Sequence, residues 1–99
     1  MSEIEIFAYT GVFAENKDTA ANLREEKITP ALNKLEHVIL NFKKIDSSTQ
    51  SFIHALISNS FQKHGEKALD LIEFKNCSTS IKKLVTAVVN YSLDVEVKI

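Results

Sequence analysis

Six neighbouring residues in this sequence combine side chains that could do chemistry. Four carry hydroxyl groups, one carries a carboxylate and one carries an amide. A strongly apolar stretch precedes them and an amphipathic stretch follows, so they lie where one structural element should end and the next begin. They are Asp46, Ser47, Ser48, Thr49, Gln50 and Ser51.

This segment admits two interpretations. Ser47 with Gln50 three residues later matches a capping box, in which the two side chains satisfy free backbone amides at the first turn of a helix and need no further function. A helix start also carries partial positive charge and free N–H groups. The same residues could therefore bind an anion, or hold a phosphate added to one of the hydroxyls. The second interpretation makes the segment a regulatory site.

No arrangement typical of an enzyme accompanies the segment. Gly11 and Gly65 stand alone, so the sequence has neither a Gly-rich phosphate loop nor a Gly-x-Ser-x-Gly nucleophile elbow. His37 is expected to open a strand. His54 and His64 are too far apart to bind a metal from one helical turn, and both are expected on a solvated helix face. We therefore expect no catalytic residue and no enzymatic activity.

Composition excludes several further classes. A net charge of −1 provides no positive field for nucleic acid. The single cysteine, Cys77, cannot form an intramolecular disulfide or a cysteine-based metal cage, and is expected to be half-buried. The first residues lack the features of a signal peptide, and no apolar run approaches the roughly 18 residues of a membrane span. We expect a cytoplasmic protein without metal, cofactor, nucleic-acid or membrane partner.

Hydrophobic periodicity predicts alternating strands and helices. Polar and apolar residues alternate in the first and last strands, whereas the second strand is a continuous apolar run, typical of a strand that is buried on both faces. The helices place their apolar residues on one stripe. The predicted strands cover residues 3–8, 37–42, 69–75 and 93–99, and the predicted helices cover about 18–35, 49–63 and 81–89.

Pro30 interrupts the first predicted helix. Asn16 or Asp18 could cap the start of this helix. At Pro30 a backbone donor is lost, so either the helix kinks there, or Thr29 caps a short second segment with Pro30 at its first position.

The order of elements predicts an α/β fold. A chain of 99 residues is long enough for one hydrophobic core and too short for two, so residues 1–99 should form a single domain. Strands separated by helices form a sheet with the helices packed on it, and parallel pairs should be joined by right-handed crossovers.

Three short motifs resemble the STAS superfamily, and most closely its STAS-like branch of unassigned function. They are Leu-Asn-Phe at 40–42, Gln-Ser-Phe at 50–52 and Phe-Lys-Asn at 74–76, followed by an apolar helix with Ile81, Leu84 and Val85. The resemblance covers residues 11–92. It implies a small mixed sheet of four to five strands, with about three helices packed mainly on one face.

The resemblance also implies a function. The best-known members of the superfamily are anti-sigma factor antagonists, bacterial signal-transduction proteins that do no chemistry. They dock a histidine-kinase-type ATPase and are phosphorylated on a Ser at this helix start, which releases the partner. The expectation is therefore a regulatory protein-interaction module that docks its partner through residues 46–51. The alternative is a small-ligand or nucleotide sensor that binds an anion at the same helix start.

The sequence departs from the Asp-Ser-Ser-Gly motif of those members. Residues 46–48 match Asp-Ser-Ser, but Thr49 stands where the Gly is expected. Alignment on the apolar strand and on Phe52 instead puts Thr49 at the Asp position and Gln50, which cannot be phosphorylated, at the acceptor position. We prefer the second alignment, because burial fixes strands and helices more firmly than a loop motif. Asn41 also stands where an Asp is usual.

The strand predicted at residues 93–99 has implications for the oligomeric state. As an edge strand it could pair with a second copy through its free backbone groups, although the charges of Glu96 and Lys98 oppose this. We expect a monomer or a weak homodimer.

Overall fold

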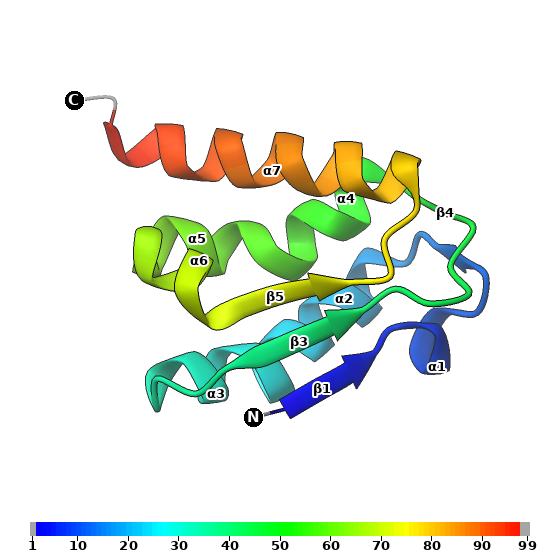
Figure 1. Cartoon of the computed structure of the whole chain (residues 1–99), viewed down its shortest axis with the longest axis horizontal. Coiled ribbons are helices and arrows are strands. Elements are labelled where there is room, and N and C mark those ends of the chain that lie inside the picture. Colours follow the sequence, from blue (N-terminus) through cyan, green and yellow to red (C-terminus); the bar gives the residue numbers. More distant parts are fainter. Residues whose placement is uncertain (1, 98–99) are drawn as a thin grey trace.

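A computed structural model describes residues 2–97, with side chains described through residue 93. In this part of the chain a parallel sheet lies against a layer of helices (Figure 1). The sheet contains three strands in the order β1-β3-β5, with bounds Ser2–Glu5, Val38–Asn41 and Ile72–Lys75. A separate parallel pair joins β2 (Phe13–Ala14) to β4 (Ser47–Ser48).

The register of the sheet separates a buried face from an open one. Ile4, Leu40 and Phe74 are aligned across the three strands and face the helices, and the first two are almost fully buried. Because successive side chains of a strand point to opposite faces, the neighbouring row of Glu3, Ile39 and Glu73 lies on the other face. Both glutamates there are exposed. Within residues 2–97, the helices therefore cover one face of the sheet.

Two long helical segments connect the strands. The first follows β2 and leads to β3, and the second follows β4 and leads through a short helix to β5. The first consists of α2 (Lys17–Leu23), the π-helical turn η1 (Arg24–Ile28) and α3 (Thr29–Asn33). The second consists of α4 (Gln50–Ile53), the π-helical turn η2 (His54–Ser58) and α5 (Asn59–His64), followed by α6 (Glu66–Leu71).

The remaining helices lie at the two ends of the described chain. The short α1 (Phe7–Thr10) directly follows β1. The long α7 (Thr79–Val97) packs along α4, η2 and α5 (Figure 1). The three expected helices are thus present, and in residues 2–97 the short α1 and α6 add to them.

Pro30 is accommodated by a widened turn. The side-chain oxygen of Asn16 accepts the amides of Asp18 and Thr19, so Asn16 is the N-cap. Thr29 has helical backbone angles and does not cap a new segment, so that alternative was wrong. Instead, π-helical turn η1 ends just before Thr29. Pro30 cannot donate to the carbonyl four residues earlier and its ring crowds that group, and a π turn relieves both conflicts without ending the helix.

The strand predicted at residues 93–99 was wrong for 93–97, which continue α7, while 98–99 lie outside the described residues. Val85, Val88 and Val89 are buried at helical spacing, and Ser92 extends the same stripe, with its hydroxyl donating to the Val88 carbonyl at 2.7 Å. This continuous stripe outweighs a short alternation that also fits a strand. The sheet therefore has fewer strands than the expected four to five, and its described pairs are all parallel rather than mixed.

The strand predicted at residues 69–75 begins later than expected. Leu69 is exposed, whereas Ala68 and Leu71 are buried on one side of α6. The apolar residues before Ile72 therefore follow a helical spacing, and only the last four residues of the prediction form β5.

One hydrophobic core fills the space between the sheet and the helices. Its largest fully buried side chains come from β3, from the residues that directly follow β1 and β3, and from the helical segments, so the core joins the sheet to the helical layer. They include Phe42, Phe52, Phe61, Ile6, Ile28, Leu32 and Leu40. Within residues 2–97, no helix has the length and apolar character needed to cross a membrane.

Truncation of a core residue should destabilise the domain strongly. Leu40→Ala should lower the free energy of unfolding by about 2–5 kcal/mol, because Leu40 is fully buried and the cavity cannot collapse completely. The matched substitution Leu69→Ala, on an exposed helix position, should change it by less than about 0.5 kcal/mol. Urea denaturation of both variants measures the difference, and equal losses would contradict this assignment of the core.

Candidate functional site

Residues 46–51, which we call the hydroxyl-rich segment, are held against β2 by backbone hydrogen bonds. The Val12 carbonyl accepts the amide of Asp46 at 2.8 Å, and the Ala14 carbonyl accepts the amide of Thr49 at 3.0 Å. In the parallel pairing of β2 with β4, Phe13 is aligned with Ser47. These contacts fix the path of the chain from the end of the sheet to the start of α4.

Thr49, and not Ser47, caps the helix. The Thr49 Oγ1 accepts the amide of Phe52 at 3.1 Å, and Thr49 has the extended backbone typical of an N-cap. Ser47 lies in β4, so the expected capping box with Gln50 was wrong. A capping-box motif can occur at any helix start. Because Ser47 pairs with β2 as part of β4, the helix cap lies two residues later than the motif predicts, at Thr49. Gln50 is the first residue of α4.

All six residues of the segment lie at the surface. Asp46, Ser47, Gln50 and Ser51 are exposed, and Ser48 and Thr49 are half-buried, the Ser48 hydroxyl donating to the Thr49 carbonyl at 3.0 Å. The fold thus brings the predicted residues together as one accessible segment.

An exposed apolar patch adjoins this segment, and the sequence analysis missed it. Tyr9, Val12 and Phe13 are 48%, 53% and 43% exposed, high values for large apolar side chains that lie so close together in the chain. A hollow of about 450 Å³ beside Tyr9 and Phe13 continues to Glu15, Asn16 and Thr19. We call Tyr9, Val12 and Phe13 the apolar patch. The available signal was a pair of apolar residues directly after the turn at Gly11.

A second hollow lies on the other side of the helix start. It measures about 430 Å³ and is lined by Gln50 and Ser51 from α4, His54 and Ala55 from η2, and Lys17 from α2. Lys17 contributes an ammonium group to this lining.

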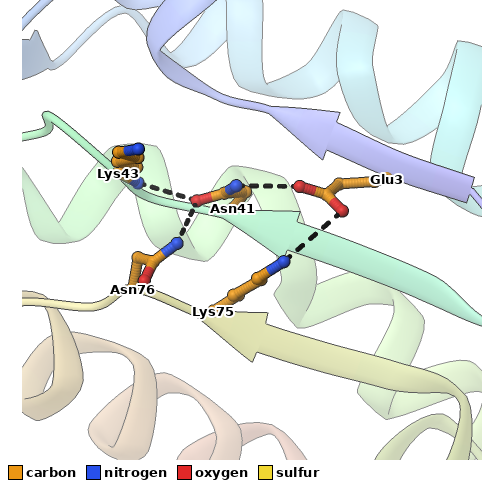
Figure 2. Close-up of polar contacts among 5 residues, drawn as sticks. All are labelled: Glu3, Asn41, Lys43, Lys75 and Asn76. Atoms are coloured by element: carbon orange, nitrogen blue, oxygen red, sulfur yellow. Dashed lines mark hydrogen bonds and ion pairs between the residues drawn. The ribbon is translucent and has the colours of Figure 1, made fainter.

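Asn41 holds the end of the central strand in place (Figure 2). Its Oδ1 accepts the amide of Lys43 at 2.9 Å and the Nδ2 of Asn76 at 3.0 Å, and its own Nδ2 donates to Glu3 Oε2 at 2.8 Å. Asn41 is 7% exposed, and its side chain joins β1, β3 and the loop after β5. Lys75 completes the group, with its Nζ 3.8 Å from Glu3 Oε1.

This network positions the loop that leads to the hydroxyl-rich segment. A buried amide that is satisfied on both its oxygen and its nitrogen fixes the direction of the chain, because each lost bond would leave a partner unpaired. Sequence reasoning singled out Asn41 only as a departure from a family pattern. A polar residue at the end of an apolar strand was the signal that could have found its role.

The histidines are scattered, and the cysteine is shielded. His37 is exposed and directly precedes β3, His54 is exposed, and His64 is half-buried at the end of α5. Cys77 is half-buried as expected, and burial raises the pKa of its thiol, partly offset by Lys82, so the thiol stays protonated at neutral pH. In the part of the chain whose side chains are described, no group of three His, Cys, Asp or Glu residues could hold a metal ion.

Comparison with known families gives one result. The model of a family described as a STAS-like domain of unknown function matches residues 19–82, more than half of the chain. The chain belongs to this family. The suspected resemblance is thereby confirmed, and the matched region of the STAS-like domain contains Asn41 and the whole hydroxyl-rich segment but not the apolar patch. Searches of curated proteins and of solved structures found no match.

Two substitutions distinguish the cap of this STAS-like domain from its neighbour. Thr49→Ala should lower the free energy of unfolding by about 1 kcal/mol, because the Phe52 amide loses its acceptor. Ser47→Ala removes an exposed hydroxyl and should cost less than about 0.5 kcal/mol. Chemical denaturation measures the free energy of unfolding of both variants. A larger loss for Ser47→Ala than for Thr49→Ala would mean that Ser47 is the cap after all.

The Asn41 network can be tested by a double-mutant cycle. Asn41→Asp should destabilise the domain by about 1–3 kcal/mol at neutral pH, because an acceptor replaces the donor that faces Glu3. Addition of Glu3→Gln supplies a new donor and should recover most of that loss. Urea unfolding of the two single variants and the double variant measures the coupling. Strictly additive losses would mean that the two side chains do not interact.

Proposed function

We propose that this STAS-like domain is a non-catalytic protein-interaction module that regulates a partner protein by docking it. The docking surface consists of Val12 and Phe13 together with Ser47, Gln50 and Ser51 around the start of α4. The observation that carries the proposal is the parallel pairing of β2 with β4, which sets exposed apolar side chains beside exposed hydroxyls.

The composition of this surface fits protein recognition. Interfaces between proteins combine apolar side chains that are buried on binding with a polar rim that donates and accepts hydrogen bonds. Val12 and Phe13 supply the apolar part, and Ser47 and Ser51 supply the rim. Both parts are held rigidly, since β2 and β4 share backbone hydrogen bonds, so little conformational entropy is lost on docking.

The same surface would respond to phosphorylation. A phosphate on Ser47 or Ser51 would add nearly two negative charges at the edge of the apolar part, which would disfavour a docked partner. Ser51 lies in the first turn of the helix, where the backbone dipole favours negative charge, so the fold itself would tolerate the modification. Ser48 and Thr49 are less suited, because their hydroxyls are engaged in hydrogen bonds within the chain.

The family resemblance indicates which partner to test first. A histidine-kinase-type ATPase would dock and phosphorylate a domain of this kind, and the chemistry would belong to that partner. A complex of this type would form in the cytoplasm.

A second candidate function is the sensing of a small anionic ligand or nucleotide. The hollow lined by Lys17, Gln50 and Ser51 favours it, because a cation faces the start of a helix there. The amides of Thr49 and Phe52 are already bonded within the chain, however, which leaves fewer donors for an anion. We therefore rank it below protein docking.

Substitutions on the docking surface should separate these functions. Phe13→Ser and Ser51→Asp should each reduce recovery of the partner from native lysate by about tenfold. Phe13→Ser removes an apolar anchor, and Ser51→Asp introduces a charge into the polar rim of the docking surface. Intact-mass analysis of the recovered wild-type domain reports any added phosphate. Quantitative mass spectrometry of the proteins that co-purify with each variant provides the measurement.

Leu69→Ser is the matched control for Phe13→Ser, because Leu69 is a similarly exposed apolar residue on α6, at the other end of the molecule (Figure 1). It should leave recovery unchanged. Recovery that falls equally in all three variants would contradict the assigned surface. If wild type retains no partner but is stabilised against heat by inorganic phosphate or ATP, the sensor function gains support and protein docking loses it.

A further inference from the structure

The outer edge of β5 is open. Among residues 2–97, β5 pairs with β3 on one side and with no strand on the other. The Lys75 carbonyl accepts the amide of Phe42 at 2.8 Å, so the backbone of Lys75 points into the sheet. Because backbone direction alternates along a strand, the N–H and C=O groups of Phe74 point outward. A strand edge of this kind offers a template for a further strand.

Space is available along this edge. A hollow of about 590 Å³ separates it from α7, which packs on the helical layer instead. The half-buried Phe74 lines this hollow, together with Cys77 and the aliphatic side chain of Val85. An added strand could therefore approach β5 and insert an apolar side chain beside Phe74.

We propose that this edge binds a second copy of the same chain, through antiparallel pairing of the two β5 strands about a twofold axis at Phe74. In that register the two Phe74 residues exchange their outward N–H and C=O groups as a hydrogen-bonded pair. The second copy's Phe74 then enters the same hollow, and the two three-stranded sheets become one continuous sheet.

The charges on β5 are self-complementary in this register. Glu73 lies opposite Lys75 of the second copy, and Lys75 lies opposite its Glu73, so the symmetric interface contains two pairs of opposite charge. Both side chains are exposed on the open face of the sheet. The contact of Lys75 with Glu3, at 3.8 Å and partly exposed, is weak enough to be exchanged for the new pair.

The opposite edge of the sheet disfavours the same arrangement. The amides of Ser2 and Ile6 bond to β3, so the backbones of Glu3 and Glu5 point outward on β1. Every antiparallel self-pairing of these two residues sets carboxylate against carboxylate, which is destabilising. The charge pattern therefore selects β5 and leaves β1 blocked. The interface shares no residue with the docking surface of Val12, Phe13, Ser47, Gln50 and Ser51, so the dimer does not depend on the proposed function.

Sedimentation equilibrium tests the proposal. The protein concentration should extend to about 1 mM, because a dissociation constant of this size marks the weak end of specific association. Wild type should show a concentration-dependent dimer. Glu73→Lys and Lys75→Glu should each raise the dissociation constant by about tenfold or more, because both charge pairs become repulsive. The double variant with both substitutions exchanges the charges, restores complementarity and should restore the dimer.

Glu26→Lys makes the same change of charge on an exposed helix position and should leave association unchanged. Circular dichroism establishes that each variant is folded. A wild-type protein that stays monomeric over the whole range overturns the proposal. A dimer that is unaffected by both single charge reversals, or that the double variant fails to restore, also overturns it, because the contact would then lie elsewhere.

Discussion

The rest of the structure depends on the placement of β3 between two parallel neighbours. Its backbone is bonded on both sides, and Val38 and Leu40 are fully buried against the helices. A strand buried in this way cannot end at random, because its last polar groups must still find partners. Asn41 meets that requirement with bonds to β1, to the following loop and to the loop after β5. The chain therefore leaves the sheet in one direction, toward β4 and α4.

That direction explains why the apolar patch and the hydroxyl-rich segment form one surface. The loop from Asn41 reaches the Val12 carbonyl through the amide of Asp46. The short pairing of Ser47–Ser48 with Phe13–Ala14 then holds the cap of α4, Thr49, beside Ala14. A two-residue pairing contributes little stability alone. It persists because both of its strands lead directly into helices whose buried residues, such as Ala20 and Phe52, are part of the common core.

The order of strands also determines which surfaces stay available. Both crossovers place their helices on the same face of the sheet (Figure 1). The layer of helices therefore buries one side of the sheet and leaves the other to Glu3, Glu73 and Lys75. Parallel sheets are usually covered on both faces. Here the open face carries charges instead of a second apolar layer, which makes exposure to water favourable.

Local signals are enough to predict the apolar run of β3, the helical stripe from Phe52 to Phe61 and the family motifs. They also limit the first helix cap to Asn16 or Asp18, and the structure selects Asn16. The identity of the second cap, the helical state of residues 93–97 and the apolar patch depend instead on contacts between elements that are distant in the sequence. Ser47 and Thr49 are both residue types that cap helices, with Ser if anything the better cap, and the pairing of β4 with β2 selects Thr49. A short alternation such as 93–97 fits a strand or the end of a helix, and the burial of the preceding stripe settled it. Exposure of Val12 and Phe13 is a property of how distant elements pack, which no local pattern contains.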